Sequence, residues 1–237
     1  MIPEFVPTEL EALGLVLDPE VLQHLDAYLE LLLEANRSVN LTAVREPDAA
    51  WRRLIVDSLT PLPLFDLPPE ARVVDIGTGA GLPGLPLAIV CPGVHFSLVD
   101  STRKKTTFLE SVITALKLEN VEVLAERAET LGQRRDHRET YDLAISRAIG
   151  PMPLVLEYSL PLVKVGGAVI AMKGPKVVDE LEVSGDAMTL LGAGDVELVP
   201  AYPESFANDL LLVRLSKEEP TPRAYPRPPG TPKRLPL

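Results

Sequence analysis

The sequence predicts an α/β protein: a doubly wound sheet of seven mostly parallel strands, with a helical extension at its N-terminus. From Arg72 onward, short apolar runs alternate with helix-length segments, which is the pattern of buried parallel strands covered by helices on both faces. The last two apolar runs have no helix-length segment between them, so we expect an antiparallel pair at one edge of the sheet. Before Arg72, apolar residues recur only at helical spacing.

The extension is expected to cover residues 1–66 and to contain two helices. Proline suits the first turn of a helix and Asp18 can cap it, so the first helix is expected to begin at Pro19. The second is expected to begin near Pro47. Apolar residues at helical spacing define both helices: Val21, Leu22, Leu25, Tyr28, Leu29 and Leu32 in the first, which is expected to end at Asn36, and Trp51, Leu54, Ile55 and Leu59 in the second, which is expected to end before Pro61.

The sheet domain is expected to cover residues 67–217, followed by a tail, 218–237. Between Pro220 and Leu237 the tail holds seven prolines, four basic residues and no acidic ones. Pro-rich segments without an apolar face seldom fold alone, so we expect a solvated, extended tail. The seven predicted strands are residues 73–76, 96–99, 121–124, 143–145, 168–172, 196–199 and 210–215.

Composition limits the classes of protein that remain. The 237 residues, 46% of them apolar, suit one large aliphatic core. There is no run of about 20 apolar residues and no basic-then-apolar N-terminus, so we expect a cytoplasmic protein that does not enter a membrane. The net charge of −11 argues against binding nucleic acid by overall attraction, so any RNA contact must use local basic patches.

Cysteine and histidine usage predicts neither a disulfide nor a metal site. Cys91 is the single cysteine, and we expect it to be buried and unreactive, as free cysteines commonly are. His24, His95 and His137 show no metal-ligand spacing, so no metal is expected.

A glycine-rich loop follows the first predicted strand, from Asp75 to Gly84. Gly77, Gly79 and Gly81 stand at alternate positions, which removes the Cβ atoms that would block a ligand. In an open α/β sheet such a turn lies in the crevice at the carboxyl ends of the strands. Its backbone N–H groups can hold an anion, here the carboxylate of a methionine moiety.

The loop alone does not choose between cofactors, because Gly79-x-Gly81-x-x-Gly84 also fits the dinucleotide pattern. Asp75 ends the strand, where it can face a ligand, and this Asp-x-Gly-x-Gly-x-Gly arrangement is more typical of methyltransferases than of dehydrogenases. Asp100 ends the second strand, where it can accept hydrogen bonds from both ribose hydroxyls of either cofactor. The preferred prediction is S-adenosylmethionine (SAM). The alternatives are an NAD-dependent dehydrogenase, for which neither a substrate domain nor a proton-relay residue is visible, and a non-catalytic SAM-sensing ribosome-assembly factor.

Other polar motifs follow the next strands. Arg127-Ala128-Glu129 is expected beside an adenine ring, Ser146-Arg147-Ala148 beside the reactive sulfonium, and Lys173-Gly174-Pro175 at the end of the fifth strand. Arg103, Lys104 and Lys105 open the helix after Asp100. Their simplest interpretation is a solvated face. Three cations at a helix N-terminus are disfavoured by the dipole, however, so RNA phosphate is the second hypothesis. The tail has the same alternative, a basic strap that lies along RNA.

Taken in order, these motifs resemble the RsmG-type (GidB-like) methyltransferases, which form N7-methylguanine in small-subunit ribosomal RNA. The resemblance covers nearly the whole chain. It rests on Asn40-Leu41-Thr42, Asp57-Ser58-Leu59, the loop from Asp75 to Gly84, the run from Leu98 to Lys105, Arg127-Ala128-Glu129, Ser146-Arg147-Ala148, Met172-Lys173-Gly174-Pro175 and, in outline, Tyr225-Pro226-Arg227, Pro228 and Pro232.

The resemblance implies a Rossmann-like class I SAM-dependent methyltransferase whose target is a guanine in the decoding-region loop of 16S rRNA. Its partner would be 16S rRNA, the 30S subunit or an assembly intermediate, and we expect a monomer. The chain departs from the family pattern in two places, since Leu54 stands where the family has His and Asn208-Asp209 where it has Arg-His.

Guanine N7 carries a lone pair and no proton, so its methylation needs positioning rather than a general base. We therefore assign three residues to positioning the guanine and its phosphates: Arg147, Asn40 and Lys173. The predicted cofactor residues are Asp75, Gly77, Gly79, Gly81, Leu82, Asp100, Ser101, Thr102, Ala128, Glu129 and Arg147. The predicted RNA-binding residues are Arg103, Lys104, Lys105 and Arg227.

Overall fold

The computed structural model describes residues 2–65 and 67–237, and its centre is a seven-stranded sheet of order β3-β2-β1-β4-β5-β7-β6. Strands β1 to β5 are mutually parallel, whereas β7 is antiparallel to both β5 and β6. All seven predicted strands and the antiparallel pair at the edge are therefore confirmed. The strands are β1 (Arg72–Ile76), β2 (His95–Val99), β3 (Val121–Leu124), β4 (Tyr141–Arg147), β5 (Val163–Lys173), β6 (Ala193–Pro200) and β7 (Leu211–Lys217).

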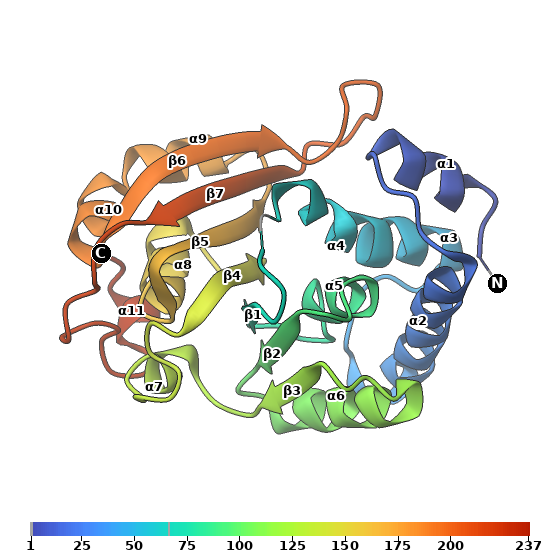
Figure 1. The fold of residues 1–237 in the computed structure, drawn as a ribbon, viewed down its shortest axis with the longest axis horizontal. Helices are drawn as coiled ribbons and strands as arrows, with labels where there is room; N and C mark the ends of the chain where they lie inside the picture. Colours follow the sequence, from blue (N-terminus) through green and yellow to red (C-terminus); the bar gives the residue numbers. More distant parts are fainter. Residues whose placement is uncertain (1, 66) are drawn as a thin grey trace.

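Helices cover both faces of the sheet, as Figure 1 shows. Along β4, Leu143 and Ile145 point into one core, and Ala144 between them points into the other. This alternation is why the strands are apolar at successive positions. One face is covered by α5 (Gly84–Val90), α6 (Arg103–Leu116) and the N-terminal helices, and the other by α7 (Ala128–Leu131), α8 (Met152–Ser159), α9 (Val177–Glu182) and α10 (Gly185–Leu191).

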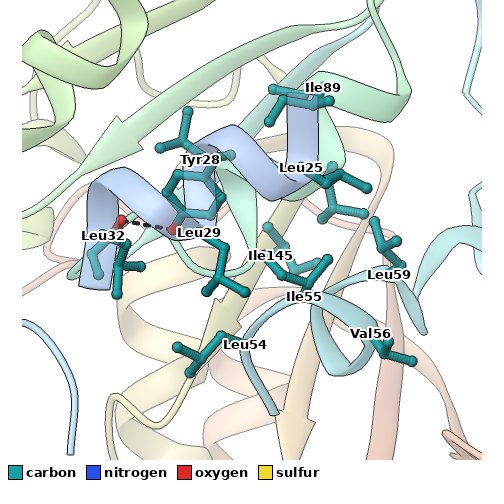
Figure 2. Close-up of a cluster of buried hydrophobic side chains, with 14 of the residues drawn as sticks. Leu25, Tyr28, Leu29, Leu32, Leu54, Ile55, Val56, Leu59, Ile89 and Ile145 are labelled. Carbon is teal, nitrogen blue, oxygen red and sulfur yellow. Dashed lines mark hydrogen bonds between the residues drawn. The ribbon is translucent and has the colours of Figure 1, made fainter. Parts of the chain in front are cut away.

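The N-terminal helices share the first of these cores. Leu25, Tyr28 and Leu29 of one helix meet Ile55 of another and Ile145 of β4 (Figure 2). The helices are α1 (Phe5–Ala12), α2 (Pro19–Val39), α3 (Pro47–Ala50), a π-helical turn (Trp51–Val56) and α4 (Asp57–Leu59), followed by a 3-10 turn (Leu62–Leu64). Met1 and Asp66, the ends of the predicted extension, lie outside the described residues. Within the described ranges, no helix is both long and apolar enough to cross a membrane.

Two details of this region differ from expectation. Helix α1 was not predicted. It is held by tertiary contacts that periodicity does not reveal, among them Arg52, which pairs with Glu9 and lies 3.7 Å from the ring centroid of Phe5. Helix α2 was expected to end at Asn36 but continues to Val39. The amide of Asn36 is instead buried and binds the chain beyond the helix, because its Oδ1 accepts from the N–H groups of residues 41 and 42.

The prediction of a solvated tail is wrong, because residues 218–237 are bound to the domain and end in the short helix α11 (Thr231–Arg234). Arg138 donates to the carbonyls of Thr221 and Tyr225, and Arg227 pairs with the buried carboxylate of Glu157. The segment has few apolar residues, so polar contacts from distant parts of the sequence fix it. Arg227, a predicted RNA-binding residue, is thus engaged in an ion pair within the protein.

Cys91 is partly exposed rather than buried, which corrects a second expectation. Its position at the end of α5 is nevertheless largely covered, and this burial raises the pKa of the thiol. The thiol form is therefore favoured, in agreement with an unreactive cysteine.

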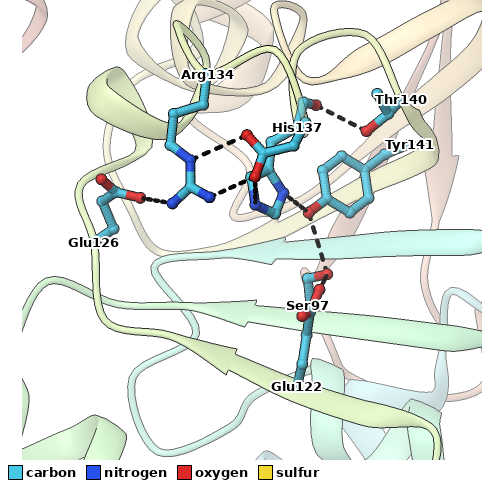
Figure 3. A network of polar contacts seen from close by, with 8 residues as sticks. Ser97, Glu122, Glu126, Arg134, His137, Thr140 and Tyr141 are labelled. Carbon is cyan, nitrogen blue, oxygen red and sulfur yellow. Dashed lines mark hydrogen bonds and ion pairs between the residues drawn. The ribbon is translucent and has the colours of Figure 1, made fainter.

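A polar network joins β2, β3 and β4 to the loop before β4 (Figure 3). The ring of His137 lies 2.6 Å from the hydroxyl of Tyr141, which donates to Ser97 Oγ, and Ser97 donates in turn to Glu122. His137 is nearly buried and stacks on Tyr141. Burial lowers the pKa of His137, although Asp136 partly opposes this shift.

This lowered pKa predicts a loss of stability in acid. The unfolded chain protonates His137 near its ordinary pKa of about 6.5 while the folded protein resists it, so unfolding becomes easier as pH falls below that value. Urea unfolding at about pH 8 and about pH 5.5 should show a larger acid loss for the wild type than for His137→Gln. Equal losses in the two proteins would contradict this role of His137.

Candidate functional site

A cavity opens at the carboxyl ends of β1, β2 and β3, where the predicted motifs meet. The strand order reverses between β1 and β4, and ligands of open α/β sheets bind at such a switch point. The cavity is lined by Ile76, Gly77, Val99, Asp100, Ser101, Glu126, Arg127, Ala128, Glu129, Ile149 and Tyr158. Sequence reasoning thus placed Gly77, Asp100, Ser101, Ala128 and Glu129 in one site.

Neighbouring residues pack closely against the glycine loop. Gly77 has φ of +69°, and a Cβ there would lie 2.5 Å from Ile149 Cγ2, so both backbone conformation and space require glycine. The N–H groups of residues 77 and 78 donate to the carbonyl of Val99, which ties the loop to β2. The other predicted loop residues, Gly79, Gly81 and Leu82, continue this turn into α5.

Asp75 holds the loop from inside and does not face the cavity, which corrects the expectation from sequence. It is fully buried, and its Oδ2 accepts from Thr78 Oγ1 at 2.6 Å and from the N–H of Gly84 at 2.8 Å. Burial raises the pKa of Asp75 to about 7, against the opposing effect of these two hydrogen bonds. Its Oδ1 is buried and has no hydrogen-bond partner among the described residues.

Asp100 lies on the cavity wall beside the loop. Its Oδ2 accepts from the N–H of Gly79 at 3.1 Å, and its Oδ1 accepts from the N–H of Thr102, the residue before α6, at 2.8 Å. The ammonium of Lys105 lies 3.4 Å from Oδ2 and is only partly exposed. Lys105, predicted to meet RNA phosphate, is therefore paired with a carboxylate of the cavity wall, while Arg103 and Lys104 are exposed.

Glu129 and Tyr158 form another part of the cavity wall. Glu129 is 3% exposed, and its Oε1 accepts from the hydroxyl of Tyr158 at 3.2 Å and from the N–H of Gly230 at 2.8 Å. Burial raises the pKa of Tyr158 to about 12, and the neighbouring carboxylate of Glu129 adds to the shift. The tyrosine therefore remains a hydroxyl donor to Glu129.

Arg147 extends from the end of β4 toward the N-terminal helices. Its Nη2 donates to the carbonyl of Arg53 at 2.7 Å and to Asp57 Oδ2 at 3.2 Å. Arg53 lies in the π-helical turn and Asp57 directly follows it, and such turns are frequent at functional sites. Nη1 is buried without a hydrogen-bond partner in the described part of the chain.

Asp57 and Tyr202 form the other side of the Arg147 contact. The hydroxyl of Tyr202 donates to Asp57 Oδ1 at 2.6 Å. Burial raises the pKa of Asp57, whereas the Tyr202 hydrogen bond and the charge of Arg147 oppose that shift. Sequence reasoning assigned neither residue a role. Asp57 stands in a noted motif, but Tyr202 lies after β6 and no local pattern marks it.

A second cavity lies at the carboxyl ends of β4 and β5; Ala148 lines it, and the next residue, Ile149, lines the first. Its lining includes three cationic residues, Arg147, Lys173 and Lys176. Lys173 was predicted to contact substrate, but its side chain is only 10% exposed, and its ammonium binds Glu180 Oε2 at 2.6 Å and the carbonyl of Gly150 at 2.7 Å. It therefore fixes the turn after β4.

Of the remaining predicted positions, Asn208 reaches these contacts, because a hydrogen bond from its side chain to Asp57 opposes the rise in the pKa of that carboxyl. Asn40 is exposed in a left-handed conformation directly after α2. Leu54, where the resembled family has His, is buried in the core, whereas Asn208 and Asp209 are exposed between β6 and β7. The two departures thus concern one packing position and one surface loop.

Comparisons with known proteins agree with this geometry. The "Ribosomal RNA small subunit methyltransferase G" of Moorella thermoacetica is 41% identical over 224 residues, covering 94% of this chain and 93% of the relative. That of Bacillus subtilis is 37% identical and covers 94% of each chain.

Two solved structures are similar in fold alone. A SAM-dependent O-methyltransferase from Thermotoga maritima superposes with a TM-score of 0.54, at 16% identity over 81% of this chain and 72% of that one. A putative rRNA-methylase from Clostridium thermocellum has a TM-score of 0.51, at 16% identity over 71% of this chain and 98% of that one. The predicted class of fold is confirmed.

A family profile gives the same assignment as the relatives. The profile of the GidB family, described as "rRNA small subunit methyltransferase G", matches residues 21–204. This match covers most of the chain, and the relatives named above extend over nearly all of it. The chain therefore belongs to the GidB family of rRNA small subunit methyltransferase G proteins.

Proposed function

We propose that this protein transfers the methyl group of SAM to N7 of a guanine in the decoding-region loop of 16S rRNA. The observation that carries the proposal is the pair of cavities at the carboxyl ends of the parallel strands. One is lined by Gly77, Asp100 and Glu129, and the other by cations around Arg147. A methyl donor in the first and a nucleobase in the second would meet at the end of β4. The family assignment leaves no support for the dehydrogenase alternative.

The residues of the first cavity suit SAM. The carboxylate of Asp100 would accept from the ribose hydroxyls, and the loop N–H groups would meet the methionine carboxylate. Ala128 and Glu129 would adjoin the adenine. The bound cofactor supplies an electrophilic methyl group on a sulfonium. The remaining predicted cofactor residues, Asp75, Gly79, Gly81, Leu82, Ser101, Thr102 and Arg147, would shape or border this site.

The chain would promote transfer by alignment rather than by proton transfer. Guanine N7 has no proton to lose, so the protein must hold N7, the methyl carbon and sulfur in line, an effect worth up to roughly 7–11 kcal/mol in model systems. Positive charge moves from sulfur to the purine, so fixed dipoles near both groups matter. We assign Arg147 and Asn40 to positioning the guanine, and Lys173 to the turn beside it.

Recognition of RNA would depend on local charge. The protein has a net charge of −11, but Arg103 and Lys104 are exposed near one cavity and Lys176 lines the other. An unstacked guanine presents N7 without opening of a duplex. We propose that the substrate is the small subunit or an assembly intermediate in the cytoplasm, and that the protein acts as a monomer.

Lys105 offers a test of the cofactor side of the site. Its ammonium lies beside Asp100 and 3.9 Å from the position of a Cβ on Gly79, where the methionine carboxylate would approach. Lys105→Gln should weaken SAM binding about fivefold, the size expected for one partly exposed charge pair. Lys104→Gln, one residue away and exposed, should leave SAM binding unchanged by calorimetry. If the two variants had equal effects on SAM binding, Lys105 would be assigned to RNA binding, as first predicted, and not to the SAM site.

The function itself is tested with labelled SAM and small subunits that lack N7-methylguanine. Nucleoside mass spectrometry should find the label in N7-methylguanine of 16S rRNA. Label in another nucleoside would correct the target atom. Tight SAM binding with no transfer to naked rRNA, mature subunits or assembly intermediates would support the SAM-sensing assembly factor instead.

A further inference from the structure

The segment after β7 (residues 218–237, here called the C-terminal strap) is fixed by a carboxylate in the middle of α8. Glu157 is completely buried. It accepts from three groups of Arg227: the backbone N–H at 2.8 Å, Nε at 2.9 Å and Nη2 at 2.6 Å. Removing one partner of such a buried pair leaves an uncompensated charge, so the contact is strongly specified.

Further contacts hold the strap along its length. The guanidinium of Arg138 donates to the carbonyls of Thr221 and Tyr225, both at 2.7 Å, and Gln133 donates to the carbonyl of Pro226 at 2.9 Å. Arg227 also donates to the carbonyl of Leu235, which folds the end of the strap back on itself. The strap is therefore a docked element with one defined path.

This path leads to the cofactor cavity. The N–H of Gly230 donates to Glu129 Oε1 at 2.8 Å, the same oxygen that accepts from Tyr158. Tyr158 follows Glu157 directly in α8, so one turn of that helix both anchors the strap and contacts Glu129. The carboxylate of Glu129 is thus held between α8 and the strap at the cavity wall.

We propose that the C-terminal strap is a positioning element of the SAM site. The Arg227–Glu157 pair fixes the strap, and the Gly230 N–H then holds the Glu129 carboxylate in the orientation that receives the adenosine half of the cofactor. This inference rests on the proposed assignment of Glu129 to the SAM site. The inferred role differs from that of an RNA-binding arm, because the guanidinium of Arg227 is engaged within the protein.

The test measures SAM binding to the full chain by calorimetry without RNA. Arg227→Ala should weaken binding about tenfold, because a strap that is no longer anchored stops holding Glu129. The affinity of Arg227→Lys for SAM should lie between those of the wild type and Arg227→Ala, because a lysine keeps the charge but cannot reproduce the paired geometry of the guanidinium. The matched control is Arg234→Ala, which removes an exposed cation from the same strap and should change SAM binding less than about twofold.

Steady-state kinetics distinguish positioning from general destabilisation. At a temperature where circular dichroism shows every variant folded, Arg227→Ala should raise KM for SAM and leave kcat and KM for the small subunit unchanged. A chain that ends at Pro228 keeps Arg227 but lacks Gly230, and it should show the same loss even if Arg227→Ala does not fold. A chain that ends at Leu235 retains both contacts and should bind SAM normally.

Glu129→Ala separates failure of this inference from failure of the proposed site. If Glu129→Ala weakens SAM binding, Arg227→Ala in that background should add no further loss. If Glu129→Ala weakens binding but Arg227→Ala and the chain ending at Pro228 do not, the strap has no positioning role and the site assignment stands. If Glu129→Ala binds SAM normally, the site assignment fails and the inference with it. Loss of rRNA affinity alone in Arg227→Ala would identify an RNA arm and overturn the proposal.

Discussion

Asp100→Ala should weaken SAM binding about 100-fold, because two hydrogen bonds to a charged carboxylate are lost at once. Asp100 is 7% exposed, and both of its oxygens are already oriented by backbone N–H groups, from Gly79 and Thr102. A carboxylate held in this way meets a ribose without first losing side-chain freedom. Calorimetric titration of SAM into the purified variant measures the loss directly.

The controls for this variant separate charge from shape. Asp100→Asn keeps the shape and one acceptor, so it should lose only about tenfold in affinity. Asp195→Ala removes an exposed carboxylate from edge strand β6 and should leave binding unchanged. If Asp100→Ala binds SAM within about threefold of the wild type while remaining folded, Asp100 does not contact the ribose, and the orientation proposed for the cofactor is wrong.

Much of the fold was predictable because local sequence and tertiary environment agree along the strands. Strands β1, β2, β4 and β5 carry buried apolar residues on both faces, and the segment from Ala193 to Lys217 contains no helix, so both the sheet and its antiparallel edge follow from pattern. Helix α1 did not follow, because eight residues of weak periodicity are stable only through distant contacts such as that between Arg52 and Glu9. The prediction of a solvated C-terminal tail was wrong for the same reason, because contacts with distant residues fix that segment.

The site was predictable where one strand end supplies a whole function and unpredictable where distant residues meet. The loop from Gly77 to Gly81 lies where its glycines predict, because the chain itself forms the turn. Lys105 was assigned from its charge at a helix N-terminus and Lys173 from its place at a strand end, and neither feature reveals that each ammonium pairs with a carboxylate of its own region. Asp57 and Tyr202 are 145 positions apart, so only the folded chain joins them.

The same distant contacts give Arg147 the second large expected effect. Arg147→Ala should lower kcat about 10²- to 10³-fold, the range seen when one preorganised donor or a near-attack geometry is lost. SAM binding should change much less, because Arg147 lines the second cavity rather than the first. Single-turnover transfer to small subunits, with SAM binding measured in parallel, distinguishes these two effects. Arg147→Lys should not restore the rate, because a lysine has one nitrogen where the guanidinium has more: Nη2 of Arg147 donates to both Arg53 and Asp57, and Nη1, which has no hydrogen-bond partner among the described residues, would remain for the guanine.

The pH dependence of kcat tests whether Asp57 holds Arg147 in place. Burial raises the pKa of Asp57 and the Tyr202 hydrogen bond opposes that rise, so acid should protonate the carboxylate, loosen Arg147 and lower kcat. Tyr202→Phe removes the opposing bond, so the acid limb of the profile should move to higher pH. Asp57→Asn should abolish that limb and lower kcat at all pH values. Because Asp57 would act only through Arg147, Asp57→Asn in the Arg147→Ala background should cost nothing further. Additive losses would show that the two residues act independently and that Asp57 does not position the arginine.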